Sequence, residues 1–242
     1  MERFRGPAAG VRSKSSHTDL VSEADDRAEA AIVAHIAARR PDDGLIAEEG
    51  SVEEGSVQEG RSGVRWLVDP LDGTINYLYG QPHWCVSIAA SDELGAVAGV
   101  VYDPSRDELF TAARGEGARL AGRSVAVSAV IDPAMALVAT GFSYDATERA
   151  EQAAVAARLA GSVRDLRRAG SAALDLAWVA AARLDAYFEV SRSPWDTAAG
   201  ELLVREAGGA VTWTEDHEIV ASGQGVHAAL LALLRASHGS PG

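Results

Sequence analysis

Apolar residues recur with the three- to four-residue spacing of an amphipathic helix in five segments of the chain. In the first of them Ser22 precedes Glu23 and Asp25, which is a typical N-capping pattern, and this helix should end before Pro41. The other predicted helices cover residues 147–160, 171–182, 196–207 and 226–235.

Shorter apolar runs between turn residues predict strands at 44–47, 64–68, 84–90, 96–102, 108–112, 185–190 and 210–213. Up to about residue 130 the strands follow one another as a meander. Beyond it they alternate with helices, which is typical of a layered α/β structure with parallel pairing. Because no long Gly, Ser or Pro linker separates the halves, we expect two subdomains that share one interface. The predicted units are a lead-in at 1–18, an N-terminal α+β subdomain at 19–130 and a C-terminal α/β subdomain at 131–242.

Acidic residues outnumber basic ones. The 242 residues include 22 Lys and Arg against 35 Asp and Glu, so the formal net charge is −13. A charge of this sign repels nucleic-acid backbones and anionic lipid surfaces, so neither a nucleic acid nor a membrane is an expected partner. One cysteine cannot form an intrachain disulfide, and the sequence shows neither a signal-peptide core nor a membrane-spanning run. We therefore expect a cytoplasmic protein.

Five carboxylates lie at the ends of predicted elements: Asp25, Glu48, Asp69, Asp72 and Asp196. Residues that follow neighbouring strands can meet at one edge of a sheet. A cluster of acidic side chains formed there must bind cations or hold protons. Carboxylate oxygens are hard ligands, and among common cations they suit Mg²⁺ best.

The densest acidic motif is Asp69-Pro-Leu-Asp-Gly-Thr74, which directly follows a predicted strand. Pro70 fixes the chain as it leaves the strand, and Gly73 lets backbone N–H groups approach a bound oxyanion. Two aspartates three residues apart can reach adjacent metal ions, and paired metal ions are a standard arrangement for phosphoryl transfer to water. A phosphoaspartyl enzyme would carry Asp-x-Asp instead, so the spacing argues against a covalent aspartyl intermediate.

Several other residues are assigned no chemistry. Cys85 lies in an apolar strand and is predicted to be a small core residue. Lys14 is either a surface cation or a residue that tunes the metal loop. The histidines without metal-ligand spacing are His17, His35, His83 and His217.

Six motifs, taken in order, resemble those of the inositol monophosphatase family of Mg²⁺-dependent, lithium-sensitive phosphatases. They are Lys14–Asp25, Ile46–Glu49, Asp69–Tyr77, Gly170–Ala173, Asp185–Glu189 and Pro194–Gly200. The resemblance runs from residue 14 to about residue 212. It implies an α/β fold of alternating αβαβα layers, a phosphoric monoester hydrolase that acts on a small phosphate ester, and a homodimer.

The resemblance also implies which residues bind metal. Glu48, Asp69 and the carbonyl of Leu71 would hold one Mg²⁺. Asp69, Asp72 and Asp196 would hold a second. A third, weaker ion would rest on Glu48, so two to three Mg²⁺ ions are expected.

The same resemblance implies the catalytic residues. Asp25 would hydrogen-bond Thr74, and this pair together with Glu48 would orient the water that attacks phosphorus, while a bound Mg²⁺ lowers the pKa of that water. The N–H groups at the start of the following turn would cradle the phosphate. The substrate contacts implied are Asp72, Gly73, Thr74, Ala172 and Glu189.

The substrate expected from the resemblance is myo-inositol 1-phosphate. Glu189 and the form Asp-Gly-Thr-Ile-Asn-Tyr favour it over the Asp-Gly-Thr-Lys-x-Phe common in relatives that act on nucleotide or histidinol phosphates. Histidinol phosphate, fructose 1,6-bisphosphate and 3′-phosphoadenosine 5′-phosphate stay open. A different class also stays open, because some relatives bind transcription machinery: an interaction protein with incidental phosphatase activity. Calcium storage is disfavoured, since the carboxylates lack the spacing of an EF-hand loop.

The chain departs from the family pattern in two places. Relatives usually place a long helix before the lysine motif, whereas only 13 residues precede Lys14 here, so a truncated or absent first helix is expected. A tandem EEGSV pentapeptide lengthens the loop after residue 48. We expect this polar loop to be solvated and to loosen the third metal.

Overall fold

The structure is a computed structural model that describes residues 4, 10–13, 20–50, 57–58, 60–190 and 193–238. Two sequence predictions fall largely outside these residues. One concerns Lys14–Asp19 of the first motif, and the other concerns the tandem EEGSV repeat beyond Gly50.

Most strands of the N-terminal half form one eight-stranded sheet in the order β10-β9-β8-β7-β6-β5-β3-β4. Neighbouring strands are antiparallel except for the parallel pair β3 and β5. The elements are β1 (Arg12–Ser13), β2 (Leu20–Val21), α1 (Glu23–Arg39), β3 (Gly44–Ala47), β4 (Val57–Gln58), β5 (Arg65–Asp72), α2 (Thr74–Leu78), β6 (Cys85–Asp92), β7 (Gly95–Asp103), β8 (Glu108–Ala113), β9 (Gly117–Leu120) and β10 (Arg123–Ser124).

The C-terminal half forms a five-stranded sheet in the order β12-β11-β13-β15-β14. Pairing is parallel for β12, β11 and β13, as the alternation of strands and helices predicts, but β15 and β14 join it antiparallel. The elements are the 3₁₀ helix η1 (Pro133–Met135), β11 (Leu137–Thr140), α3 (Ala146–Leu159), β12 (Asp165–Arg167), α4 (Ala172–Ala180), β13 (Ala186–Val190), α5 (Pro194–Glu206), β14 (Ala210–Trp213), β15 (Glu218–Ser222) and α6 (Gln224–His238).

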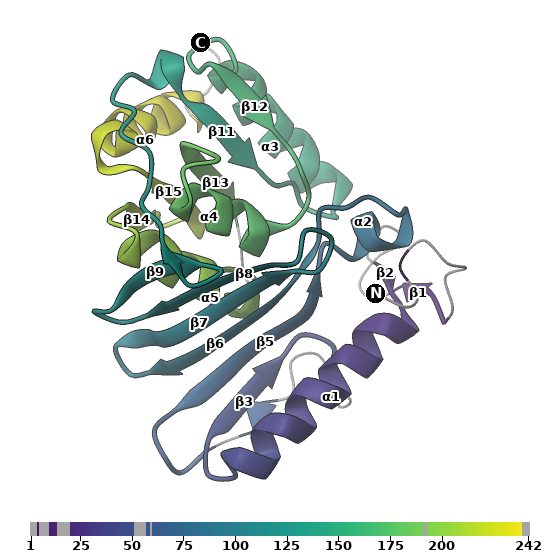
Figure 1. Cartoon of the computed structure of the whole chain (residues 1–242). Coiled ribbons are helices and arrows are strands. Elements are labelled where there is room, and N and C mark those ends of the chain that lie inside the picture. Colours follow the sequence, from purple (N-terminus) through teal and green to yellow (C-terminus); the bar gives the residue numbers. More distant parts are fainter. Residues whose placement is uncertain are drawn as a thin grey trace.

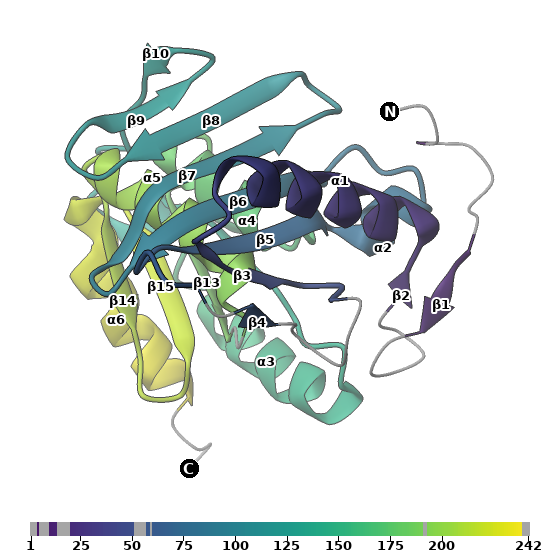
Figure 2. The ribbon, with the colours of Figure 1, turned by 90° about the horizontal axis from the view of Figure 1, so that it is seen from below.

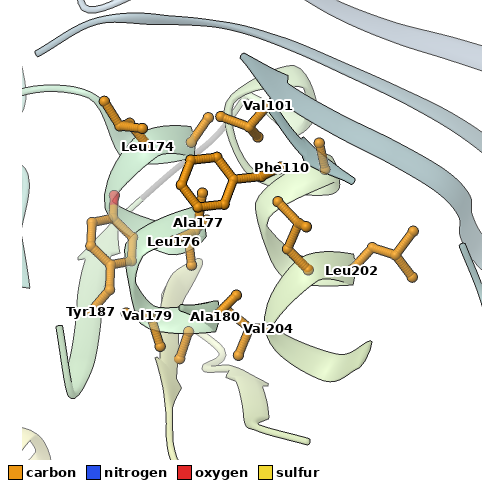
Figure 3. Close-up of a cluster of buried hydrophobic side chains, with 14 of the residues drawn as sticks. Val101, Phe110, Leu174, Leu176, Ala177, Val179, Ala180, Tyr187, Leu202 and Val204 are labelled. Carbon is orange, nitrogen blue, oxygen red and sulfur yellow. The ribbon is translucent and has the colours of Figure 1, made fainter. Parts of the chain in front are cut away.

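Helices and sheets alternate in five layers (Figures 1 and 2). Helix α1 lies on the outer face of the eight-stranded sheet, α4 and α5 lie between the two sheets, and α3 and α6 cover the far face of the five-stranded sheet. The expected αβαβα sandwich is confirmed. The largest cluster of buried apolar side chains fills the middle layer, where Phe110 of β8 points toward α4 and α5 (Figure 3).

Helix α1 begins and ends where its sequence predicts. The Ser22 side chain accepts a hydrogen bond from the Ala24 N–H, while the Asp25 carboxylate accepts one from the Ser22 N–H, which is a reciprocal capping box. The helix ends at Arg39, and its C-cap Arg40 directly precedes Pro41. No helix within the described part of the chain is long and apolar enough to span a bilayer.

Two differences from the predicted elements matter for the site. Strand β5 does not stop before Asp69 but continues through Pro70 to Asp72, with an irregular register against β6 between the two aspartates. Proline cannot donate to the ladder, so the strand bulges at this point. In the C-terminal half, β11, β12 and β15 have no counterpart among the predicted strands, and in the N-terminal half the short strands β1, β2, β4, β9 and β10 have none either. β15 is buried at every position, so it lacks the alternation that marks a half-exposed strand.

Candidate functional site

Two acidic side chains meet where β3 ends beside its parallel neighbour β5. In the pairing of β3 with β5, Ala47 lies opposite Val68, so the next residues, Glu48 and Asp69, become neighbours. The Glu48 N–H donates to the Val68 carbonyl at 3.1 Å, which holds the chain in this register just beyond β3. The strand-end argument from the sequence therefore holds for Glu48, which follows β3, whereas Asp69 lies within β5.

Helix α5 brings a third carboxylate to the same place. Pro194 is the first residue of α5 and Asp196 lies in its first turn. The Ser87 hydroxyl donates to the Trp195 carbonyl at 3.3 Å, and Ser87 lies opposite Asp69 in the pairing of β5 with β6. One carboxylate oxygen from each of Glu48, Asp69 and Asp196 lies within 4.8 Å of the other two.

The electrostatics of this cluster favour a cation. Asp69 is 2% exposed, and burial, reinforced by the charges of Glu48, Asp72 and Asp196, raises its pKa well above the usual range. A divalent cation would supply the missing positive charge and let the carboxylates ionise together. The oxygen-only donor set fits Mg²⁺.

Asp72 is not part of this three-carboxylate cluster. Its Oδ2 accepts hydrogen bonds from the Ser171 hydroxyl and the Ala173 N–H, both at 2.7 Å, and from the Cys85 thiol at 3.8 Å. Burial raises the pKa of Asp72 to about 6, opposed by the bonds from Ser171 and Ala173. Among the described residues these bonds all reach Oδ2, which leaves Oδ1 as the oxygen that could bind a metal.

Sequence reasoning missed the hydroxyl that contacts Asp72. Ser171 lies in the quoted Gly170–Ala173 motif and is the residue before α4, yet its side chain caps nothing in that helix. It donates to Asp72 instead. Its place in that motif could have marked Ser171 as a site residue, but the spacing of the sequence does not reveal Asp72 as its partner. Cys85 is fully buried, and burial raises the pKa of its thiol well above the usual range, which confirms it as a core residue.

The expected hydrogen bond between Asp25 and Thr74 is present. Asp25 is fully buried, and its Oδ2 accepts from the Ser22 N–H at 3.0 Å and the Ser22 hydroxyl at 2.6 Å. Its Oδ1 lies 3.0 Å from the Thr74 hydroxyl, which is also 3.1 Å from the Leu71 carbonyl. Burial raises the pKa of Asp25, while the bonds from Ser22 and Thr74 lower it. The capping box thus aims Asp25 at Thr74.

Gly73 forms a turn that another residue would not fit. Its φ is +94°, in the region that favours glycine. A Cβ placed here would lie 3.0 Å from the His83 carbonyl oxygen, 3.2 Å from the Gly170 carbonyl oxygen and 3.2 Å from the Trp84 Cα. All three atoms are main chain, so the space cannot open by a rotamer change.

Glu189 and Ala172 lie on the C-terminal side of the site. Ala172 is the first residue of α4, and Glu189 is in β13, where the Tyr187 hydroxyl donates to its carboxylate. Burial raises the pKa of Glu189 to about 7, and the charge of Asp72 adds to this effect. Gly141 leaves the space that the Glu189 carboxylate occupies, because a Cβ at residue 141 would collide with it.

Without bound metal, the protein should become less stable as the pH rises. Unfolded Asp72 and Glu189 release their protons near pH 4, whereas the folded protein keeps them until about pH 6 and pH 7. Between these values the folded state binds more protons, so the free energy of unfolding falls with increasing pH. Thermal unfolding in EDTA should show a higher midpoint at pH 5 than at pH 7.5.

At pH 7.5 Mg²⁺ should raise the unfolding midpoint, because it binds only the folded state. At pH 5 it should change the midpoint little, because protons compete for the carboxylates. The variant Asp72→Asn should show a shallower pH dependence in EDTA than the unchanged protein. A midpoint in EDTA that increases from pH 5 to pH 7.5 would contradict the assigned electrostatics.

Comparison with known proteins gives one consistent family. The family model described as the inositol monophosphatase family matches residues 1–239. The Nus factor SuhB of Escherichia coli (strain K12) is 43% identical over 243 residues, covering 97% of this chain and 89% of the relative. The inositol-1-monophosphatase of Mycobacterium leprae is 41% identical over 247 residues, covering 97% and 85%.

Solved structures agree. The extragenic suppressor protein SuhB of Bartonella henselae superposes with a TM-score of 0.86 at 39% identity, over 93% of this chain and 88% of that chain. An IMPase/NADP phosphatase, solved in complex with Mg²⁺ and phosphate, gives a TM-score of 0.79 at 25% identity, over 93% of this chain and 86% of that chain.

Proposed function

Because the chain belongs to the inositol monophosphatase family, we propose that it is a Mg²⁺-dependent phosphatase that hydrolyses a small phosphate monoester. The observation that carries this proposal is the cluster of Glu48, Asp69 and Asp196, three carboxylates from three separate elements whose oxygens converge within 4.8 Å. Like charges that are buried at Asp69 and half-buried at Glu48 and Asp196 are costly to hold together unless a cation accompanies them. A family structure that contains both Mg²⁺ and phosphate supports the choice of metal and of substrate chemistry.

We assign the metal ligands as follows. Glu48, Asp69 and the Leu71 carbonyl would hold one ion, and Asp69, Asp72 through Oδ1, and Asp196 would hold another. A third would rest on Glu48. When bound, such ions lower the pKa of water, neutralise the phosphate and stabilise the charge that develops on the leaving oxygen.

The chain's own residues would orient the attacking water. The Thr74 hydroxyl has one hydrogen, which it donates to Asp25 or to the Leu71 carbonyl. Its lone pairs therefore remain to accept a hydrogen bond from water. If Glu48 accepts the other hydrogen of that water, the oxygen lone pair must point away from both acceptors, toward phosphorus. Fixing this orientation removes rotational freedom that the reaction would otherwise have to lose.

The substrate would lie between the two halves of the molecule. We assign the phosphate to the N–H groups of Gly73 and Thr74, and the hydroxyls of the alcohol to Glu189 and the backbone at Ala172. With its pKa raised to about 7, Glu189 can both donate and accept hydrogen bonds near neutral pH. This capacity suits a ring that carries several hydroxyls, so myo-inositol 1-phosphate is the substrate that we propose.

A panel of esters tests the proposal. Phosphate release should be measured from myo-inositol 1-phosphate, histidinol phosphate, fructose 1,6-bisphosphate and 3′-phosphoadenosine 5′-phosphate, each with Mg²⁺ and with EDTA. We expect the highest kcat/KM for the inositol ester and no turnover in EDTA. A tenfold preference for another ester would refute the substrate, and turnover in EDTA would refute the metal mechanism.

A second function is favoured by the names of the relatives. The 43% identical Escherichia coli protein is named Nus factor SuhB, and the family resemblance leaves binding to transcription machinery open. We propose as the alternative that this chain binds transcription machinery. Such binding would need the folded surface and not the hydrolytic step, so the two functions separate in a variant that folds but does not turn over.

A further inference from the structure

The segment Gln81–His83, which we name the strap, is hydrogen-bonded at each residue. The Gln81 N–H donates to the Asn76 carbonyl at 2.8 Å, and Arg106 donates to the Pro82 carbonyl at 2.7 Å. The side-chain amide of Asn76 donates to the His83 carbonyl at 2.7 Å. Each residue of this part of the connection between α2 and β6 is thus tied by a hydrogen bond to Asn76 or Arg106.

The strap forms one wall of the slot that holds Gly73. The slot is lined by the His83 carbonyl oxygen, the Trp84 Cα and the Gly170 carbonyl oxygen, and a Cβ on residue 73 would press on all three. The Asn76 amide also donates to the Ala169 carbonyl at 2.8 Å, so it ties the strap to the segment before α4. Where Gly73 lies is therefore decided by how the strap is placed against the C-terminal half.

The His83 side chain makes a second connection to that half. Its Nε2 lies 3.1 Å from Asp175 Oδ1, and the two side chains are only 12% and 3% exposed. The ring also packs edge-on against Trp178, with centroids 5.0 Å apart at 89°. Asp175 is in the first turn of α4, close to Ser171 and Ala173, which hold Asp72. One side chain thus links the wall behind Gly73 to the helix start that positions Asp72.

A buried pair of this kind adds little net stability, because removing both groups from water costs about as much as their attraction returns. It does specify one relative placement of the elements that carry it. We propose that His83, acting through Asp175, is a positioning residue that sets the phosphate-binding turn at Gly73 against the start of α4. This inference rests on the proposed phosphatase function.

The proposal predicts a selective defect. The cluster of Glu48, Asp69 and Asp196 comes from the residue after β3, from β5 and from α5, none of which contains a residue of the pair. Binding of the ion assigned to Glu48 and Asp69 should therefore be preserved when the pair is broken. Phosphate affinity should fall, because the turn is no longer fixed. A role in folding alone would lower the active fraction without changing the affinity of the remaining molecules.

The test compares matched variants of the full chain. His83→Phe keeps a ring against Trp178 and loses the bond to Asp175, while His83→Gln keeps a donor within reach. The control is His238→Phe, because His238 Nε2 makes the same 3.1 Å contact with the buried carboxylate of Glu218, between α6 and β15. Calorimetry at saturating Mg²⁺ measures binding of inorganic phosphate, and kcat and KM are measured for the preferred ester.

We expect His83→Phe to weaken phosphate binding and raise KM about tenfold, with kcat within threefold of the unchanged protein. His83→Gln should restore most of the affinity, and His238→Phe should change neither quantity. If His83→Phe folds poorly, the double variant His83→Phe/Asp175→Leu removes the unpaired charge and should show the same loss. Phosphate affinity within twofold of the unchanged protein in a folded His83 variant would overturn the proposal.

Because phosphate binding is measured without turnover, the two proposals fail in different ways. A protein that binds phosphate but hydrolyses no ester would refute the proposed function and leave the affinity comparison decisive for His83. A protein that binds no phosphate even with Mg²⁺ would overturn both.

Discussion

Asp69→Asn should nearly abolish ester hydrolysis and, in the absence of metal, raise the thermal stability of the protein. Asp69 is assigned to both principal ions, so loss of its charge should lower turnover by about 10³-fold, equivalent to about 4 kcal/mol of transition-state stabilisation. The measurement is phosphate release at saturating Mg²⁺. A variant with the unchanged rate would refute the two-metal assignment.

The stability gain follows from the pKa of Asp69, which burial and neighbouring carboxylates raise well above its usual range. At neutral pH the unfolded chain releases this proton more readily than the folded protein, so the group destabilises the folded state. Asparagine removes that cost and can still accept the 2.9 Å bond from the Leu71 N–H. Unfolding in EDTA at pH 7.5 should show a higher midpoint, whereas Asp165→Asn, at an exposed residue paired with Arg167, should change neither stability nor turnover.

The same Asp69→Asn protein distinguishes the two candidate functions. If the chain acts by binding transcription machinery, pull-down of transcription complexes by the variant should equal that by the unchanged protein. If binding is absent from both proteins, the alternative is wrong. If binding requires turnover, it should be lost with Asp69.

Gly73→Ala should strongly reduce both stability and turnover. Its φ of +94° strains any residue with a Cβ by about 1–3 kcal/mol, and the new methyl would also press on main-chain atoms of His83, Trp84 and Gly170. We expect a loss of about 3 kcal/mol in the free energy of unfolding. Turnover should fall at least tenfold, because the turn proposed to bind phosphate must move.

Gly95→Ala is the matched control for this change. Gly95 has a similar φ of +107°, but a Cβ there would meet nothing within 4 Å. Its cost should therefore be the backbone strain alone, and turnover should be unchanged. Urea unfolding and phosphate release measured on both variants give the comparison. Equal losses of stability and activity in the two variants would show that the slot around Gly73 has no special role.

Local chemistry in the sequence was enough to predict most helices and several strands. Ser22 and Pro41 mark the limits of α1 because capping and the missing proline N–H act within a few residues. The strands of the meander alternate between a buried and a half-exposed face, which produces a period of two. β15 escaped detection because helices on both faces of its sheet bury it completely, and that burial is a property of the assembled layers.

The identities of the site carboxylates were accessible from the sequence because strand ends and helix starts are local features, and the resemblance of their motifs to one family added their expected roles. The contacts of these carboxylates could not be predicted from the sequence. Asp72 contacts Ser171 and Ala173, about 100 positions further along the chain, because α4 happens to begin beneath the end of β5.

The sequence by itself determined the acidic character of the protein, the order of its elements and the residues available to bind a cation. Only the tertiary structure decided that Glu48, Asp69 and Asp196 converge, that Asp72 faces α4 instead, and that His83, which has no informative spacing, pairs with Asp175. The physical reason is the distance along the chain over which each interaction acts. Capping, turns and periodicity act over a few residues, whereas packing two sheets around α4 and α5 sets contacts between residues that are far apart in the chain.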